Sequence, residues 1–317
     1  MEEVVKNHII SGVIWLDTDG IPIQAHGGGI LFHEGVYYWY GENKDGVSRN
    51  ARVDVIGVSC YSSCDLFTWK NEGIVLPAVT NDLNHDLNPQ MVLERPKVIY
   101  NDSTRKFVMW MHIDSADYSY ARSGIAISDS PVGPFEYIGS FRPNDKMSRD
   151  MTLFKDEDGK AYHICSSEEN STLYITLLSD DYLSPTTKYT RNFINNFREA
   201  PALFKHEGKY YIITSGCTGW SPNEAEYAVA ENIMGPWKVI GNPCLGTDAE
   251  TTFHSQGTYV LPIEGKNGAY IFMADRWKRE DLRDSRYIWL PLQIKNNTIE
   301  VRWLNIWDLS YFEGENK

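Results

Sequence analysis

The sequence has few signals for long helices and no long hydrophobic run. No long segment repeats apolar residues at the spacing of an amphipathic helix, whereas short β-branched and aromatic runs broken by Gly, Asp and Asn are frequent. No apolar run approaches the roughly 20 residues of a membrane span, and residues 1–6 lack the apolar core of a signal peptide. We therefore expect an all-β protein that is cytoplasmic, or secreted if a leader has been removed.

Paired cysteines and excess positive charge are also missing. The 5 cysteines form no paired framework, and Cys60 and Cys64 have no second Cys or His pair to complete a zinc site. We expect these thiols to be free and buried. The net charge of −13 would repel the phosphates of nucleic acid and an anionic membrane surface. A neutral partner fits this charge best, and the aromatic share of 13% suits both β-strands and flat platforms for sugar rings.

What the sequence does contain is a repeated hairpin. An apolar strand, a polar turn and an aromatic-rich strand recur in residues 28–42, 95–113, 151–167, 200–216 and 257–275. Turns such as His33-Glu34-Gly35 and His206-Glu207-Gly208 are typical of β-hairpins. A second similarity, between residues 128–135 and 230–237, follows the hairpins and indicates a third and an outer strand.

Each repeat is therefore long enough for a four-stranded sheet, since the units recur roughly every 50 to 70 residues. Four-stranded sheets repeated around an axis are the blades of a propeller. The hairpins account for nearly the whole chain, so we predict one domain, residues 1–317, folded as an all-β, five-bladed β-propeller. A β-sandwich is the alternative fold, but it does not require like hairpins in every unit.

Polar residues stand just before the innermost strand of each predicted blade. In chain order they are Gln24, Glu94, Asp150, Glu199 and Gln256. Because the innermost strands line the central channel, their equivalent ends meet at one mouth. Crowded carboxylates repel one another, so at least one should hold a proton near neutrality. The alternative is that these residues are only polar strand ends that face solvent. It is the weaker explanation because every unit has an acid or an amide at the same position.

At these residues the sequence resembles glycoside hydrolase family 43, whose members are five-bladed β-propellers that hydrolyse glycosidic bonds with inversion. More narrowly, it resembles the exo-β-1,3-galactanases of that family. The matching stretches are residues 24–29, 40–44, 94–97, 149–151, 198–201, 218–220 and 255–257. Each motif is short, but their order and spacing extend the resemblance over essentially the whole chain.

The resemblance implies specific catalytic roles. Glu199 matches the general acid, and Asp150 matches the residue that tunes and orients that acid. Gln24 stands where the broad family has its Asp base, and an amide cannot accept a proton at ordinary pH. The galactanase subfamily lacks that base and uses a Gln of the last blade, here Gln256, with Glu94 nearby. We hypothesise that Gln256 positions the attacking water and that Glu94 either shares the proton or binds sugar hydroxyls.

Further residues are candidates for contacts with the sugar: Gln24, His26, Glu42, Tyr118, Thr218 and Trp220. Trp220 would stack on a ring face, although packing is an equal alternative for Trp220 and Tyr118. His26 would contact the sugar or line the channel. Residues 27–29 are glycines that no lysine or helix start follows, so close strand approach explains them better than a phosphate loop.

The predicted partner is an oligo- or polysaccharide, with no nucleic acid and no membrane, and the sequence makes no prediction of the oligomeric state. The reaction requires no cofactor. A structural calcium ion in the channel is compatible with the resemblance, because such ions occur in some family members, but no metal ligand set can be identified in the sequence.

Two alternative functions stay open. One is an α-L-arabinofuranosidase or β-xylosidase of the same broad family, although Gln24 in place of the usual Asp disfavours it. The other is a catalytically silent sugar-binding propeller, because a missing base is what decay would produce. Retention of Glu199 and Asp150 disfavours that alternative, since binding alone needs no tuned acid. A protein-interaction propeller would have a channel mouth without crowded acids.

Overall fold

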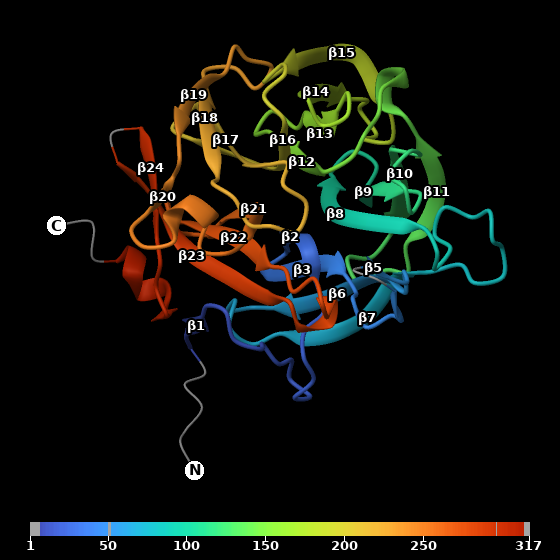
Figure 1. Ribbon diagram of the computed structural model, residues 1–317, viewed down its shortest axis with the longest axis horizontal. Coiled ribbons are helices and arrows are strands. Elements are labelled where there is room, and N and C mark those ends of the chain that lie inside the picture. Colours follow the sequence, from blue (N-terminus) through green and yellow to red (C-terminus); the bar gives the residue numbers. More distant parts are fainter. Residues whose placement is uncertain (1–6, 50–51, 296, 314–317) are drawn as a thin grey trace.

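The chain folds as a five-bladed β-propeller, as predicted (Figure 1). The computed structural model describes residues 7–49, 52–295 and 297–313. Blade 1 consists of β2 (His26–His33), β3 (Val36–Glu42), β6 (Gly57–Ser63) and β7 (Lys70–Pro77). Blade 2 consists of β8 (Val92–Asn101), β9 (Lys106–Asp114), β10 (Arg122–Ser128) and β11 (Glu136–Phe141).

The remaining blades repeat this antiparallel order. Blade 3 consists of β12 (Met151–Lys155), β13 (Ala161–Ser167), β14 (Thr172–Leu178) and β15 (Pro185–Asn192). Blade 4 consists of β16 (Arg198–His206), β17 (Lys209–Gly216), β18 (Glu226–Ala230) and β19 (Lys238–Gly241). Blade 5 consists of β21 (Gln256–Pro262), β22 (Tyr270–Arg276), β23 (Arg286–Lys295) and β24 (Thr298–Arg302), with β20 (Cys244–Leu245) added in parallel at its outer edge.

The innermost strands close a ring around the central axis. Strands β2, β8, β12, β16 and β21 contact one another in that order, and β21 returns to β2 (Figure 1). The strands of each blade come from one continuous stretch of the chain, so among the described residues no blade pairs an N-terminal strand with a C-terminal one. Outside the ring, the first described strand, β1 (Ile9–Ile10), pairs with the last, β25 (Ile306–Trp307). Ile9, only 2% exposed, packs into the core shared by blades 1 and 5.

The hairpin turns have the backbone conformation that the sequence predicted. Glu34 and Gly35, between β2 and β3, have φ of 49° and 84°. Glu207 and Gly208, between β16 and β17, have φ of 46° and 78°. Two successive residues at positive φ match the right-handed twist of paired strands and produce a tight hairpin.

The core lies between neighbouring blades and is rich in aromatic side chains. Between blades 1 and 5, the Trp39 ring lies 4.9 Å from the ring of Trp289 and 5.3 Å from that of Trp69. All three side chains are almost fully buried. Much of the high aromatic content therefore packs the blades together and does not face a ligand.

Two expectations about minor features are tested by the structure. Cys60, Cys165 and Cys244 are buried and free, but Cys64 and Cys217 are exposed, so the prediction of burial is wrong for these two. The helical segments among the described residues are single 3-10 turns: Pro143–Asp145, Ala249–Thr251, Leu282–Asp284 and Leu309–Phe312. None of the helices described is long and apolar enough to cross a membrane.

Candidate active site

Irregularities in the innermost strands place the predicted residues at one mouth of the channel. In β8, Glu94 pairs with β9 but regular pairing resumes only at Lys97, and in β16 the same shift follows Glu199. The residues after these acids, Arg95 and Ala200, have φ of 53° and 52°, in the left-handed region. A bulge of this kind bends the strand and redirects the side chain next to it. Gln256 occupies the matching position in β21.

In the first blade, the residue equivalent to the acids of the other blades is not the one predicted from the sequence. In β2 the shift begins at His26, which pairs with Glu42, so His26 and not Gln24 is the counterpart of the acids in blades 2 and 4. Gln24 lies two residues earlier, and its buried side chain donates to the Arg283 carbonyl at 3.0 Å. The prediction that Gln24 shares this register is therefore wrong, because strand pairing and not distance along the sequence sets equivalence.

His26 is also outside the pocket. Its ring is fully buried, with Nδ1 3.0 Å from Asp275 Oδ1, and it stacks on the ring of Tyr287 at 4.8 Å. Asp275 accepts a further hydrogen bond from the backbone N–H of Gly27. His26 thus supports the bulge of blade 1 through Asp275 and does not line the pocket.

A pocket of about 240 Å³ opens where the blades meet. It is lined by Glu42, Lys44, Glu94, Arg95, His112, Tyr118, Arg149, Asp150, Asn170, Glu199, Gly219, Trp220, Gln256 and Trp277. The predicted residues brought together there are Glu42, Glu94, Tyr118, Asp150, Glu199, Trp220 and Gln256. Gln24, His26 and Thr218 do not line it; the Thr218 hydroxyl donates to the Ser221 carbonyl at 2.6 Å.

Glu199 has the properties of a proton donor. Burial, and after it the negative charge of Asp150, raises the pKa of Glu199 from 4.5 to about 7. The amide nitrogen of Gln256 donates to one carboxyl oxygen at 3.0 Å, and the amide nitrogen of Asn170 donates to the other at 3.3 Å. Repulsion between crowded carboxylates is the cause predicted from the sequence; together with burial, it leaves a large fraction of Glu199 protonated at neutral pH.

Arg95 connects two of the predicted site residues, Asp150 and Gln256. Its Nε lies 2.9 Å from Asp150 Oδ2, and its Nη2 donates to Gln256 Oε1 at 2.6 Å. The same oxygen of Asp150 accepts the backbone N–H of Ala200, beside Glu199, at 3.0 Å. Arg95 therefore fixes the Asp150 side chain next to Glu199, where the negative charge of Asp150 is, after burial, a cause of the raised pKa of Glu199.

Gln256 uses every hydrogen-bonding position of its amide. The nitrogen donates to Glu199 and to Ser215 Oγ, at 3.0 and 2.9 Å. The oxygen accepts from Arg95 and from Trp277 Nε1, the latter at 3.1 Å. An amide offers two donors and two acceptor positions, so this side chain is held in one orientation. A water bound by Gln256 would replace one of these partners.

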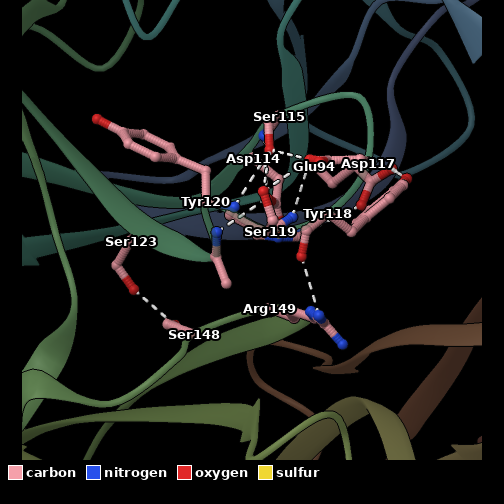
Figure 2. A network of polar contacts seen from close by, with 12 residues as sticks. Glu94, Asp114, Ser115, Asp117, Tyr118, Ser119, Tyr120, Ser123, Ser148 and Arg149 are labelled. Carbon is pink, nitrogen blue, oxygen red and sulfur yellow. Dashed lines mark hydrogen bonds and ion pairs between the residues drawn. The ribbon is translucent and has the colours of Figure 1, made fainter.

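The surroundings of Glu94 shift its pKa in the opposite direction from that of Glu199. His112 Nδ1 lies 3.2 Å from one carboxylate oxygen, and the Tyr118 hydroxyl donates to the other at 2.8 Å (Figure 2). Although burial opposes ionisation, the hydrogen bonds from His112 and Tyr118 and the charges of His112 and Lys44 lower the pKa of Glu94 to about 2. Glu94 is thus an ionised hydrogen-bond acceptor with low affinity for a proton.

Glu42 lies at the end of β3 under the same pocket. It pairs with Lys44, and its Oε1 accepts the backbone N–H of Arg95 at 2.9 Å. Burial raises its pKa despite the Lys44 charge. A Cβ on Gly27 would lie 2.1 Å from this carboxylate, and one on Gly28 would lie 1.8 Å from a backbone oxygen of β3. The glycines are therefore required for close approach, as predicted.

The site residues include one group with the composition of a metal site, but its bonding does not fit a metal. Single ligand atoms of Glu94, His112 and Asp150 lie within 4.8 Å of one another. Both nitrogens of His112 face carboxylates, on Glu94 and Asp114, so its ring is a double donor and has no lone pair for an ion. Asp150 is already neutralised by Arg95. A calcium ion in the channel stays a prediction, and this group does not support it.

Seven residues that line the pocket were not predicted from the sequence: Lys44, Arg95, His112, Arg149, Asn170, Gly219 and Trp277. Sequence adjacency could have found two of them, since Arg95 follows Glu94 and Arg149 precedes Asp150. His112 lies directly across the β8–β9 ladder from Glu94, which only strand register reveals. Asn170 and Trp277 come from loops whose direction the hairpin pattern does not specify.

Comparison with known proteins identifies the family of the chain. Residues 29–281 match the family described as Glycosyl hydrolases family 43. A solved GH43 β-1,3-galactosidase, with galactodeoxynojirimycin, is 46% identical, with a TM-score of 0.90 over 95% of this chain and 100% of that one. An exo-β-1,3-galactanase from Phanerochaete chrysosporium, solved with galactose, is 34% identical, with a TM-score of 0.87 over 96% of this chain and 68% of that one.

A third structure, an exo-β-1,3-galactanase from Clostridium thermocellum, is 39% identical, with a TM-score of 0.85 over 94% of this chain and 66% of that one. This chain thus spans about two thirds of the length of these two galactanases and the full length of the galactosidase. No curated protein sequence matches the chain. The family match extends over most of the residues, and the propeller with its acidic pocket is the fold that the resemblance implied, so this chain belongs to glycoside hydrolase family 43 and is a glycosidase.

Proposed function

We propose that the enzyme releases galactose from the ends of β-1,3-galactan chains, with inversion at the anomeric carbon. Similar solved structures carry β-1,3-galactosidase and exo-β-1,3-galactanase activities, which supports this substrate. The observation that carries the proposal is Glu199, a partly buried carboxyl whose pKa is raised to about 7 inside a pocket of sugar size. A silent sugar-binding protein would have no reason to keep a proton there.

The chemistry begins at Glu199. Its proton moves to the glycosidic oxygen while the bond from that oxygen to the anomeric carbon breaks, as general acid catalysis requires. Asp150, held by Arg95, favours the protonated acid before the reaction. Gln256 holds the spent carboxylate in place through the hydrogen bond that it already makes. Positive charge developing on the sugar is stabilised by the ionised Glu94.

Water attacks the face of the sugar opposite the leaving group. Gln256 orients this water, which takes the place of Ser215 or Trp277 at the amide while the bond to Glu199 is kept, and Glu94 accepts the proton of the water as the new carbon–oxygen bond forms. A carboxylate with a pKa of about 2 is a weak base. A weak base suffices here because the attacked carbon resembles an oxocarbenium ion, which makes the bound water strongly acidic.

The pocket shape supports removal of single sugars from a chain end. Its volume of about 240 Å³ lies below the range of about 300–1,000 Å³ typical of sites for larger ligands. A second cavity of about 290 Å³ adjoins it and shares Glu42, Glu94 and Trp220. The carbohydrate is the only partner that the family establishes; absence of binding to nucleic acid or membranes stays a prediction.

The test compares two substrates in Glu199→Gln. With β-1,3-galactobiose, kcat/KM should fall by about 10²–10⁴, because the leaving sugar needs a proton. With a dinitrophenyl β-galactoside the loss should be far smaller, because that leaving group departs unprotonated. Glu207→Gln, in the exposed turn at the other end of β16, is the control.

A panel of aryl β-galactoside, α-L-arabinofuranoside and β-xyloside completes this experiment. Selective hydrolysis of the galactoside supports the assignment. Preference for the arabinofuranoside or xyloside would replace it by the alternative activity of the same family. Equal losses on both galactosidic substrates in Glu199→Gln would show that Glu199 is not the general acid.

A further inference from the structure

One buried carboxylate holds both ends of the loop that follows β9. Asp114 Oδ1 accepts the backbone N–H of Ser115 at 2.9 Å and that of Ala121 at 2.8 Å (Figure 2). The side chain of Asp114 is fully buried, and it does not line the pocket. The loop 115–121 is thereby closed at its neck by a single residue.

The other oxygen of this carboxylate points toward the catalytic pocket. Asp114 Oδ2 lies 2.8 Å from His112 Nε2, and His112 Nδ1 lies 3.2 Å from Glu94 Oε2. His112 is 1% exposed, so water does not compete for either nitrogen. With a carboxylate on each side, both ring nitrogens donate, which is the state of an imidazolium.

The loop then returns to the same catalytic carboxylate. The Tyr118 hydroxyl at its tip donates to Glu94 Oε1 at 2.8 Å, and the Tyr118 carbonyl accepts from Arg149 Nη2 at 2.9 Å (Figure 2). Tyr118 has a φ of 58°, a conformation that needs support from its surroundings. Both oxygens of Glu94 are thus held by one hydrogen-bond network, and Asp114 supports both of its branches, through His112 and through the loop.

Several charged groups surround Glu94 and His112, the two titratable groups of this network. Glu94 is faced by the cations His112 and Lys44, and by the carboxylates of Glu42 and Glu199. His112 is faced by the carboxylates of Glu94 and Asp114, and by the ring of Tyr118. Burial disfavours the charged imidazole, but the hydrogen bonds to Asp114 and Glu94 raise the pKa of His112 to about 9.

We propose that Asp114 is a positioning residue for the reaction: it keeps His112 as the cation beside Glu94 and holds the loop that brings Tyr118 to the same carboxylate. The inference rests on the proposed function, because it assumes that Glu94 acts on the sugar or on the attacking water. Asp114 itself touches neither. Its effect passes through His112 to one oxygen of Glu94 and through the loop to the other.

Asp114→Asn separates these two effects. The amide oxygen can still accept from Ser115 and Ala121, so the loop neck is kept. The amide N–H now faces His112 Nε2, which must become an acceptor, so the ring becomes neutral. Without the adjacent cation, the pKa of Glu94 should rise toward the ordinary value of about 4.3.

The expected result is a new acid limb in the pH profile. In the wild type, kcat/KM for β-1,3-galactobiose should stay level down to about pH 3, whereas in Asp114→Asn it should fall below about pH 5. Asp114→Ala should in addition raise KM, because the loop neck is lost. Asp129→Asn removes an equally negative but exposed charge just beyond β10 and is the matched control.

A second measurement does not depend on activity. In the full-length protein with ¹⁵N-labelled histidine, His112 should carry protons on both ring nitrogens at about pH 8, where an ordinary histidine is neutral. His112→Gln identifies the resonance, and Asp114→Asn should make the ring neutral. A neutral His112 in the wild type, or a pH profile of Asp114→Asn equal to that of Asp129→Asn, overturns the proposal. A charged His112 in an enzyme without galactosidase activity would instead locate the failure in the proposed function.

Discussion

Replacing Asp150 by Asn tests the electrostatic basis of the site. The substitution keeps the size of the side chain and removes the negative charge that the Arg95 guanidinium and the Ala200 N–H now hold. In the wild type, burial and then this charge raise the pKa of Glu199 from 4.5 to about 7. A rise of that size makes the proton about 300-fold harder to remove at a given pH.

The size of the change follows from the order of these causes. Burial contributes most, so removal of the Asp150 charge should lower the pKa of Glu199 by about one unit, to about 6. Arg95, released from Asp150, acts in the same direction because it favours the ionised acid. At about pH 7 the protonated fraction of Glu199 would fall from about one half to about one tenth, a loss of about fivefold in kcat/KM. Near pH 5 the acid is protonated in both proteins and this loss vanishes.

The assay is the rate of galactose release from β-1,3-galactobiose between about pH 4 and pH 9. Because the protonated acid is the active form, activity is lost as pH rises through the pKa, and the variant should lose it at lower pH. Asp158→Asn, in the exposed turn between β12 and β13 of the same blade, is the charge-matched control. A basic limb that stays in place in Asp150→Asn, or moves upward, would refute this account of Glu199.

Two further predictions concern the attacking water and the closure of the ring. Gln256→Ala removes the amide that orients both Glu199 and the water, so kcat should fall by about 10²-fold or more. Glu94→Gln should also lower kcat. Full steady-state activity in both variants would exclude the proposed roles. Ile9→Ala, in the strand that joins the two chain ends, removes a side chain that is 2% exposed. It should cost about 2–4 kcal/mol of stability, seen as a lower Tm, and an unchanged Tm would show that the terminal pair does not hold the blades together.

Much of the architecture is encoded locally. Hairpins with tight turns at Glu34-Gly35 and Glu207-Gly208 form from residues that are neighbours in the chain, so their pattern is visible in the sequence. Their repetition implies a propeller, and a propeller brings equivalent strand ends to one mouth. This reasoning was sufficient to predict that Glu94, Asp150, Glu199 and Gln256 share one pocket.

The register of the first blade was not predictable in this way. Gln24 and His26 are both polar and lie two residues apart, so alternation along the strand allows either to be the counterpart of Glu94. The bulge that begins at His26 decides the matter, and it depends on the close approach of Gly27 and Gly28 to β3. Such contacts join residues that have no fixed separation along the chain.

The sequence by itself therefore determined the blade pattern, the family and the set of acids and amides at the channel mouth. Tertiary structure decided what each of them does. Glu94 and Glu199 are the same residue type at the same kind of bulge in an innermost strand, yet the pKa of one is lowered to about 2 and that of the other is raised to about 7. The difference comes from partners on other blades and loops, a His112 cation beside Glu94 and an Asp150 carboxylate beside Glu199. Electrostatic interaction depends on distance in space and on burial, and a linear sequence specifies neither.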